Sequence, residues 1–187
     1  SIHLNNLKIM RRHVHAEAIA DYFNANPEVF ADRLESLFDP SSVRPEEVRG
    51  YLVRHPVQLR ARLERIVPRE LHAALGLHDW AWLDGHGLND EDKRESFIER
   101  LIHAAEDVGS DWLALQQAQK TALAQEKGRV ADMFLQQLNT LKRRSLLGKL
   151  GTYGLMPKYG FPTEVVELKI RSSARESGEI ELDRDMK

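Results

Sequence analysis

The chain has 187 residues, of which 42% are hydrophobic and 30% are charged, so it is long and apolar enough to fold around a core of its own. Its 27 basic and 29 acidic side chains give a formal charge of -2, which excludes the overall positive charge of a histone-like protein. The absence of cysteine excludes disulfides, thiolate zinc sites and cysteine nucleophiles, and favours a reducing, cytoplasmic setting.

The first half of the chain has the pattern of successive helices. Residues 1–10 look extended, whereas residues 11–26 carry an apolar stripe at helical spacing and are predicted as a helix. Asn26 followed by Pro27 predicts the start of a second helix, over 27–38. Three further prolines each predict the start of a short helix, over 45–54, 56–66 and 68–75.

The middle of the chain contains a loop and two longer helices. Residues 79–89 hold two tryptophans and two glycines, which predicts a loop pinned to the core by its aromatic side chains. A helix is expected from about residue 90 to 108, where Gly109 and Ser110 interrupt it. A long amphipathic helix is then expected over 111–145, and its weak heptad fit favours a packed helical hairpin over a free coiled coil.

The end of the chain has a different residue pattern from the helical part before it. Glycines and prolines predict an irregular crossing over 148–160, and alternating β-branched residues over 163–171 and 178–182 predict a β-hairpin. The expected fold class is therefore mainly α: a multi-helix bundle with a long amphipathic helix and a C-terminal β-hairpin. We expect two units, a helical accessory module over 1–160 and, over 161–187, the start of a further domain, in a chain that is a piece of a longer protein.

Sequence motifs for catalysis and metal binding are weak. The segment from Gly148 to Thr152 has a leucine after its lysine and follows a helical pattern, so it does not match a phosphate-binding loop. His13 and His15 stand two apart, which points them to different sides of a helix, and the other histidines lack a ligand spacing. No Gly-x-Ser-x-Gly elbow is present. We therefore predict neither a catalytic residue nor a metal ligand in this chain.

Clustered basic residues are the strongest electrostatic signal. Five cations lie within residues 142–158 and no acidic residue accompanies them. Clustered cations bind phosphate groups, although a helix C-terminus also favours cations for dipole reasons alone. The candidate nucleic-acid contacts are these five residues and two arginines that could extend the surface: Lys142, Arg143, Arg144, Lys149, Lys158, Arg11 and Arg12.

A resemblance to a known family rests on two segments. Residues 156–168 read Met-Pro-Lys-Tyr-Gly-Phe-Pro-Thr-Glu-Val-Val-Glu-Leu. This segment resembles the Leu-Pro-x-Tyr-Gly-Phe-Pro-x-Asp-Val-Val-x-Leu signature that follows the motor domains of many bacterial DEAD/DEAH-box helicases of superfamily 2. Residues 4–18 resemble the segment just after the second RecA-like domain of the same helicases. Met156 and Glu164 are mild departures from the signature, and residues 27–150 resemble no known segment.

The resemblance implies that this chain is one segment of a larger helicase. The parent would be an ATP-dependent helicase or translocase that uses ATP and magnesium, and it would carry a cysteine-rich zinc-binding domain beyond residue 187. None of the family's motor motifs falls in this chain, so no catalytic or zinc residue is carried over, and no cofactor is expected in the chain itself. RecA-like motor domains in the same polypeptide would be its neighbours.

These observations predict a non-catalytic accessory segment that couples a helicase motor to nucleic acid, expected to be DNA. No apolar run reaches the roughly 18 to 20 residues of a membrane span, so no membrane partner is expected. Two alternatives stay open: a structural spacer, and a protein-interaction module of a DNA repair or phage-defence complex that uses the long helix or an exposed tryptophan loop. The least favoured hypothesis is that the chain is an independent enzyme. Basic residues on one face would favour DNA contact, and a large apolar patch would favour a partner.

Overall fold

The computed structural model describes residues 2–158, which fold into helices joined by turns, without a strand. The prediction of a mainly α fold is confirmed, and the predicted β-hairpin within 161–187 lies outside the described residues. The helices are α1 (Ile2–Ala25), α2 (Glu35–Phe38), α3 (Arg44–Leu52), α4 (Val57–Ile66), α5 (His72–Leu75), α6 (Ala81–Asp84), α7 (Asp90–Arg94), α8 (Phe97–Ala124), α9 (Gly128–Arg143) and α10 (Leu146–Thr152), with 3-10 turns η1 (Pro27–Val29) and η2 (Arg69–Leu71).

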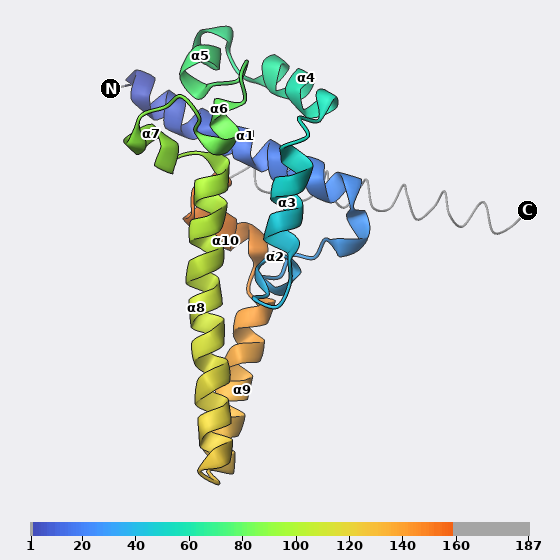
Figure 1. Cartoon of the computed structure of the whole chain (residues 1–187), viewed down its shortest axis with the longest axis vertical. Helices are drawn as coiled ribbons and strands as arrows, with labels where there is room; N and C mark the ends of the chain where they lie inside the picture. Colours follow the sequence, from blue (N-terminus) through green and yellow to red (C-terminus); the bar gives the residue numbers. More distant parts are fainter. Residues whose placement is uncertain (1, 159–187) are drawn as a thin grey trace, which may run out of the picture.

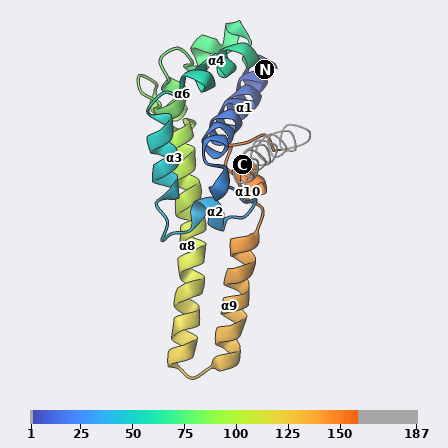
Figure 2. The same ribbon diagram turned by 90° about the vertical axis from the view of Figure 1, so that its right-hand side faces the viewer.

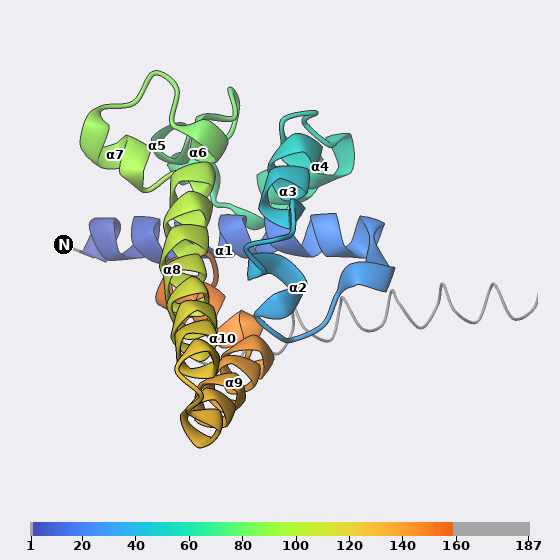
Figure 3. The ribbon, with the colours of Figure 1, turned by 60° about the horizontal axis from the view of Figure 1, so that its bottom comes forward.

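Two parts of the molecule differ in shape. The shorter helices gather around α1 and the first half of α8, while the second half of α8 and all of α9 extend away from them as an antiparallel pair (Figures 1 and 2). We call residues 113–143 the arm, and the remaining described residues the body. With the end of the arm tilted forward, α1 passes behind α8, and α10 lies on the side of α1 nearer the arm (Figure 3). The body therefore contains most of the core, and the arm is a two-helix extension of it.

Helix α1 is longer than predicted. It begins at Ile2, so the expectation of an extended segment over 1–10 is wrong. The buried residues of α1 point to several sides, because α3, α4 and α5 all pack against it and α10 is bonded to it. Leu7 and Met10 also pack against the core. The first turns therefore continue a helix whose apolar residues do not form one simple stripe.

The segment after α1 is not the single helix that was predicted over 27–38. It forms the turn η1, an extended stretch at Phe30 and the short helix α2. The Ser36 hydroxyl donates to the carbonyl oxygens of Ala31 and Arg33, both at 2.8 Å. The Asp32 carboxylate accepts from the backbone N–H of Leu147 at 2.9 Å. Local bonds of the Ser36 side chain thus replace helical hydrogen bonds in this segment, while Asp32 caps the start of α10.

The proline-initiated helices are confirmed. Helices α3 and α4, and η2 with α5, lie within one or two residues of the predicted ranges. Proline suits the first positions of a helix because its missing N–H would have no partner there. The predicted loop over 79–89 contains only the single turn α6.

The tryptophans of that loop are buried. Trp80 and Trp82 are 4% and 3% exposed, and Trp82 meets Phe97 edge to face with ring centres 6.2 Å apart. His55 stacks on Trp80 at 4.2 Å. The prediction that the aromatic side chains pin the loop to the core is confirmed. An exposed tryptophan loop is therefore not available for partner binding.

The hairpin turns later than predicted. Helix α8 passes through Gly109 without a break, and the chain reverses at residues 125–127, where Glu126 has a φ of 58°. A Cβ at Gly109 would lie 3.8 Å from Pro40 Cγ, an ordinary contact, so the packing here does not require glycine. The expected interruption at 109–110 and the single helix over 111–145 are therefore wrong, while the packed hairpin itself is confirmed.

The predicted irregular crossing over 148–160 contains a helix. Helix α10 begins after Ser145, whose hydroxyl accepts from the N–H of Gly148 at 3.1 Å. Leu146, Leu147 and Leu150 are buried against the body. The glycines of this segment are therefore compatible with one more helix, because burial of these leucines outweighs their low helix propensity.

Candidate nucleic-acid interface

The seven predicted contact residues do not lie on one face. Lys142, Arg143 and Arg144 lie at the end of α9, Lys149 lies on α10 and Lys158 follows it. Arg11 and Arg12 lie on α1, where the structure brings them together with two cations that sequence analysis missed, Lys8 and Arg100. The candidate interface therefore divides into the end of α9 and a basic pocket.

Two of the predicted lysines lie over aromatic rings. Lys142 Nζ is 5.1 Å from the ring centre of Trp112, and Lys149 Nζ is 5.9 Å from that of Tyr153. The ring face attracts a cation at such distances. The Tyr153 hydroxyl in turn donates to Asp107 on α8 at 2.7 Å. Lys142 thus links α9 to α8, whereas Lys149 contacts the tyrosine that ends its own helix.

Arg143, Arg144 and Lys158 are exposed. Within residues 2–158 their side chains form no ion pair with a carboxylate. The backbone of Arg144 is engaged, because its carbonyl oxygen accepts from the N–H of Leu34 at 3.0 Å. These three cations are available to a ligand, but the structure gives them no shared pocket.

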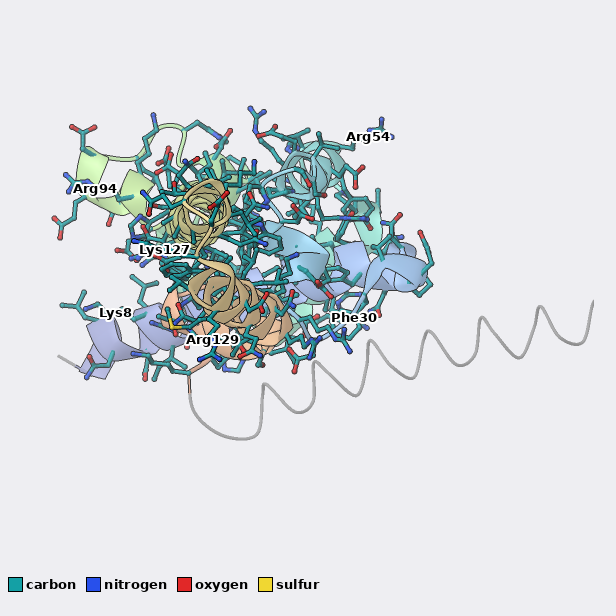
Figure 4. All side chains as sticks on the ribbon, turned by 90° about the horizontal axis from the view of Figure 1, so that it is seen from below. Lys8, Phe30, Arg54, Arg94, Lys127 and Arg129 are labelled. Atoms are coloured by element: carbon teal, nitrogen blue, oxygen red, sulfur yellow. The ribbon has the colours of Figure 1, made fainter. Side chains whose placement is uncertain are left out.

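The basic pocket lies between α1, α8 and the turn after α10. It has a volume of about 210 Å³ and is lined by Lys8, Arg11, Arg12, Glu95, Arg100 and Gly154. Lys8, Arg11 and Arg12 stand three and four residues apart on α1, a spacing that puts them on one side of a helix. Figure 4 labels Lys8 near the N-terminal end of α1. Four cations and one carboxylate give the lining a formal charge of +3.

Two of the arginines are fixed by the protein. Arg12 Nη1 donates to the carbonyl oxygens of Gly151 at 2.8 Å and Met156 at 3.1 Å. Arg100 Nη2 donates to the Glu95 carboxylate in an ion pair. Burial alone would raise the pKa of Glu95, but its hydrogen bond with Arg100 and the nearby positive charges hold that pKa below its usual value. Glu95 therefore stays ionised and orients Arg100.

His15 lies beneath the pocket. Its side chain is buried, and Nδ1 donates to the carbonyl oxygen of Gly154 at 2.9 Å. Nε2 is buried without a hydrogen-bond partner in the described part of the chain. Burial, which is the largest cause, and the charges of Arg11 and Arg100 together lower the pKa of His15 to about 4. His15 is neutral at pH 7, so the charge of the pocket comes from its lysine and arginines.

Lys8 and Arg11 are the free cations of the pocket. Lys8 is exposed and Arg11 is partly exposed, and neither side chain forms an ion pair or hydrogen bond within residues 2–158. If the sequence analysis had started this helix at Ile2, the three-residue spacing of Lys8 and Arg11 would have placed both on one side of it. Arg100 carries no such signal, because only the packing of α8 against α1 places it here. The pocket can accept an oxyanion through two free and two preorganised cations.

Among residues 2–158, no group of three or more histidine, aspartate or glutamate side chains could hold a metal ion. Gly148 to Thr152 belong to α10. None of these helices combines the length and the apolar character needed to cross a bilayer.

Comparisons with protein-family models, curated proteins and solved structures gave no match to this chain.

Proposed function

We propose that this chain is a non-catalytic accessory module of an ATP-dependent DNA helicase or translocase, and that it couples the motor to DNA by holding a backbone phosphate. The helicase assignment is supported by the resemblance of residues 4–18 and 156–168 to the segments that flank such a module. RecA-like motor domains, ATP and magnesium would belong to the rest of the parent protein, working in the cytoplasm. The phosphate contact is supported by one observation, the basic pocket.

The pocket suits a backbone phosphate better than a base. Its lining carries a formal charge of +3, and its two free cations come from one side of α1. Contacts of lysine and arginine with phosphate release counterions and do not depend on base sequence. Such contacts position a nucleic acid on a protein without selecting a sequence. That property fits a module that must follow a moving motor along DNA of any sequence.

The pocket adds Lys8 and Arg100 to the predicted contact residues and changes the order of their importance. Lys8 and Arg11 become the primary contacts, while Arg12 and Arg100 shape the pocket. Arg143, Arg144 and Lys158 stay as secondary contacts on the same protein. Lys142 and Lys149 contribute less, because each lies over an aromatic ring.

A salt titration tests this function. The double variant Lys8→Ala/Arg11→Ala is compared with wild type for binding to a labelled single strand and a labelled duplex. The loss of two phosphate contacts should reduce the slope of log affinity against log salt by about 1.4 on the single strand and about 1.8 on the duplex.

The matched control is Lys120→Ala/Lys127→Ala, which removes two exposed cations from the arm. It should leave both slopes unchanged. Equal slopes for wild type and Lys8→Ala/Arg11→Ala would contradict the proposal and favour the structural-spacer alternative. Measuring unwinding by the parent helicase with the same two variants extends the test to coupling.

A further inference from the structure

A second pocket lies on the body, between α8 and the corner that joins α2 to α3. Its volume is about 320 Å³, within the range of ligand pockets in proteins. Its floor is apolar and comes from three elements that the fold packs together: Phe38, Pro40, Pro45, Ile98, Leu101 and Ala105. We call it the apolar groove. Nothing in the proposed DNA contact uses it.

One exposed isoleucine marks the edge of this groove. Ile102 is 43% exposed and lines both the apolar groove and a neighbouring hollow of about 430 Å³ on α8. Ile98, Ile102, Ala105 and Gly109 follow one another at helical spacing along this side of α8. Gly109 ends the row, and the space beside it would accept a methyl group, since Pro40 Cγ lies 3.8 Å from where a Cβ would be. The groove is thus open beside Gly109, where a side chain with a Cβ would narrow it.

The rim of the groove is acidic. It carries Asp39, Glu46 and Glu106 against a single cation, Arg49, for a formal charge of -2. Arg49 is paired with Glu46 at 3.6 Å. Glu106 forms no ion pair in the described part of the chain and is exposed. The rim therefore presents carboxylates that a cationic ligand could pair with.

We propose that the apolar groove docks a basic, amphipathic segment of a protein partner. Apolar side chains of that segment would cover Ile102 and fill the groove, and its lysines or arginines would face Glu106 and Asp39. An amphipathic helix in an apolar groove is a recurring mode of peptide recognition. Complementary charge sets the choice of partner and the rate of association. The negative rim also repels phosphate, and the groove shares no lining residue with the basic pocket, from which the hollow lined by Ile102 and Arg100 divides it.

A designed peptide pair serves as the probe. One labelled 15-residue peptide carries leucines on one helical face and lysines on the other, and its matched peptide carries glutamates in place of the lysines. Fluorescence anisotropy with the full chain should show the lysine peptide binding at least about tenfold more tightly than the glutamate peptide. Equal binding of the two peptides, or no binding of the lysine peptide, would overturn the proposal.

Two variants locate the binding. Ile102→Asp should weaken the lysine peptide about tenfold, because it replaces apolar contact with a buried charge. Ile66→Asp is the matched control, since Ile66 is 42% exposed and lies on α4, outside the groove. It should change binding by less than about twofold. Equal losses in both variants would place the peptide elsewhere.

Reversing the charge of Glu106 should strengthen the binding of one of the two peptides. A misfolded variant could not produce such a gain in affinity. Glu106→Lys should weaken the lysine peptide by about three- to tenfold and strengthen the glutamate peptide by a similar factor, as expected for one exposed pair. Binding of DNA should stay unchanged in Ile102→Asp, which separates this proposal from the basic pocket. A dimer of the wild-type chain that Ile102→Asp dissociates in sedimentation would instead show that a second copy occupies the groove, and would overturn the choice of a foreign partner.

Discussion

The body and the arm share one helix but bury their side chains in different ways. In the body, Phe97 on α8 is fully buried between His15 and Trp82. In the arm, the same helix leaves Leu113 and Leu123 more than half exposed. Along the arm, α8 and α9 pack mainly against each other, so one stripe of each is covered. Burial, and not the regularity of the helix, decides where stability resides.

The largest expected difference between the two parts concerns their phenylalanines. Phe97→Ala should lower the free energy of unfolding by about 4 kcal/mol, because it leaves a cavity in a closely packed core. Phe134→Ala removes a partly buried ring from the arm and should lower it by about 1 kcal/mol. Urea unfolding followed by circular dichroism measures both values. Similar losses would show that the arm is packed as tightly as the body.

A second test concerns the body alone and depends on pH. The folded pKa of His15 is about 4, below the value near 6.5 of an unfolded histidine, so the unfolded chain binds a proton that the folded chain does not. Stability from this group is complete above about pH 6.5 and is lost as the pH falls toward 4, by about 3 kcal/mol in total. Urea unfolding at several pH values should show this loss.

The control for that test is His15→Asn, whose side-chain amide nitrogen takes the place of Nδ1 and can donate to the carbonyl of Gly154. Carboxylates titrate in both proteins, so the informative quantity is the difference between the two pH profiles. That difference should fall within pH 4 to 6.5. Parallel profiles would show that the pKa of His15 is the same in the folded and unfolded chains, and would contradict the prediction.

The smallest expected effect comes from shortening the arm. Replacing residues 121–131 with a four-residue glycine–serine turn joins α8 to α9 closer to the body and leaves Phe134 in place. The free energy of unfolding should change by less than about 1 kcal/mol, because none of the removed residues belongs to the core cluster or packs against it. Thermal unfolding gives this value. A loss of several kcal/mol would mean that the arm supports the body.

Sequence analysis predicted elements whose signals are local. Prolines at 45, 56 and 68 start helices for a reason contained in proline itself, and the predicted ranges were close. The break expected at Gly109 was wrong because glycine only weakens a helix, by about 1 kcal/mol, and packing of α8 outweighs that. The turn at Glu126 had no glycine or proline at its centre to indicate it.

The candidate site was only partly predictable for the same reason. Arg11 and Arg12 were identified as cations, but the pocket also requires Arg100, which lies 88 positions beyond Arg12 and arrives through tertiary packing. The run from Lys142 to Arg144 gave a stronger local signal, although Lys142 turns onto Trp112. Charge in the sequence thus indicated the chemistry, while the fold decided which charges meet.

The bonds that join α1 to the turn after α10 set an order of events in folding. Arg12 and His15 bond carbonyls that lie 139 to 144 residues away in the sequence. A ribosome adds about 5 to 20 residues per second, so α1 is made roughly 7 to 30 s before these partners exist. Contacts between distant residues also form slowly once both are present. The part of α1 that meets α10 therefore waits uncovered on the nascent chain, while α3, α4 and α5 can already pack against the rest of the helix.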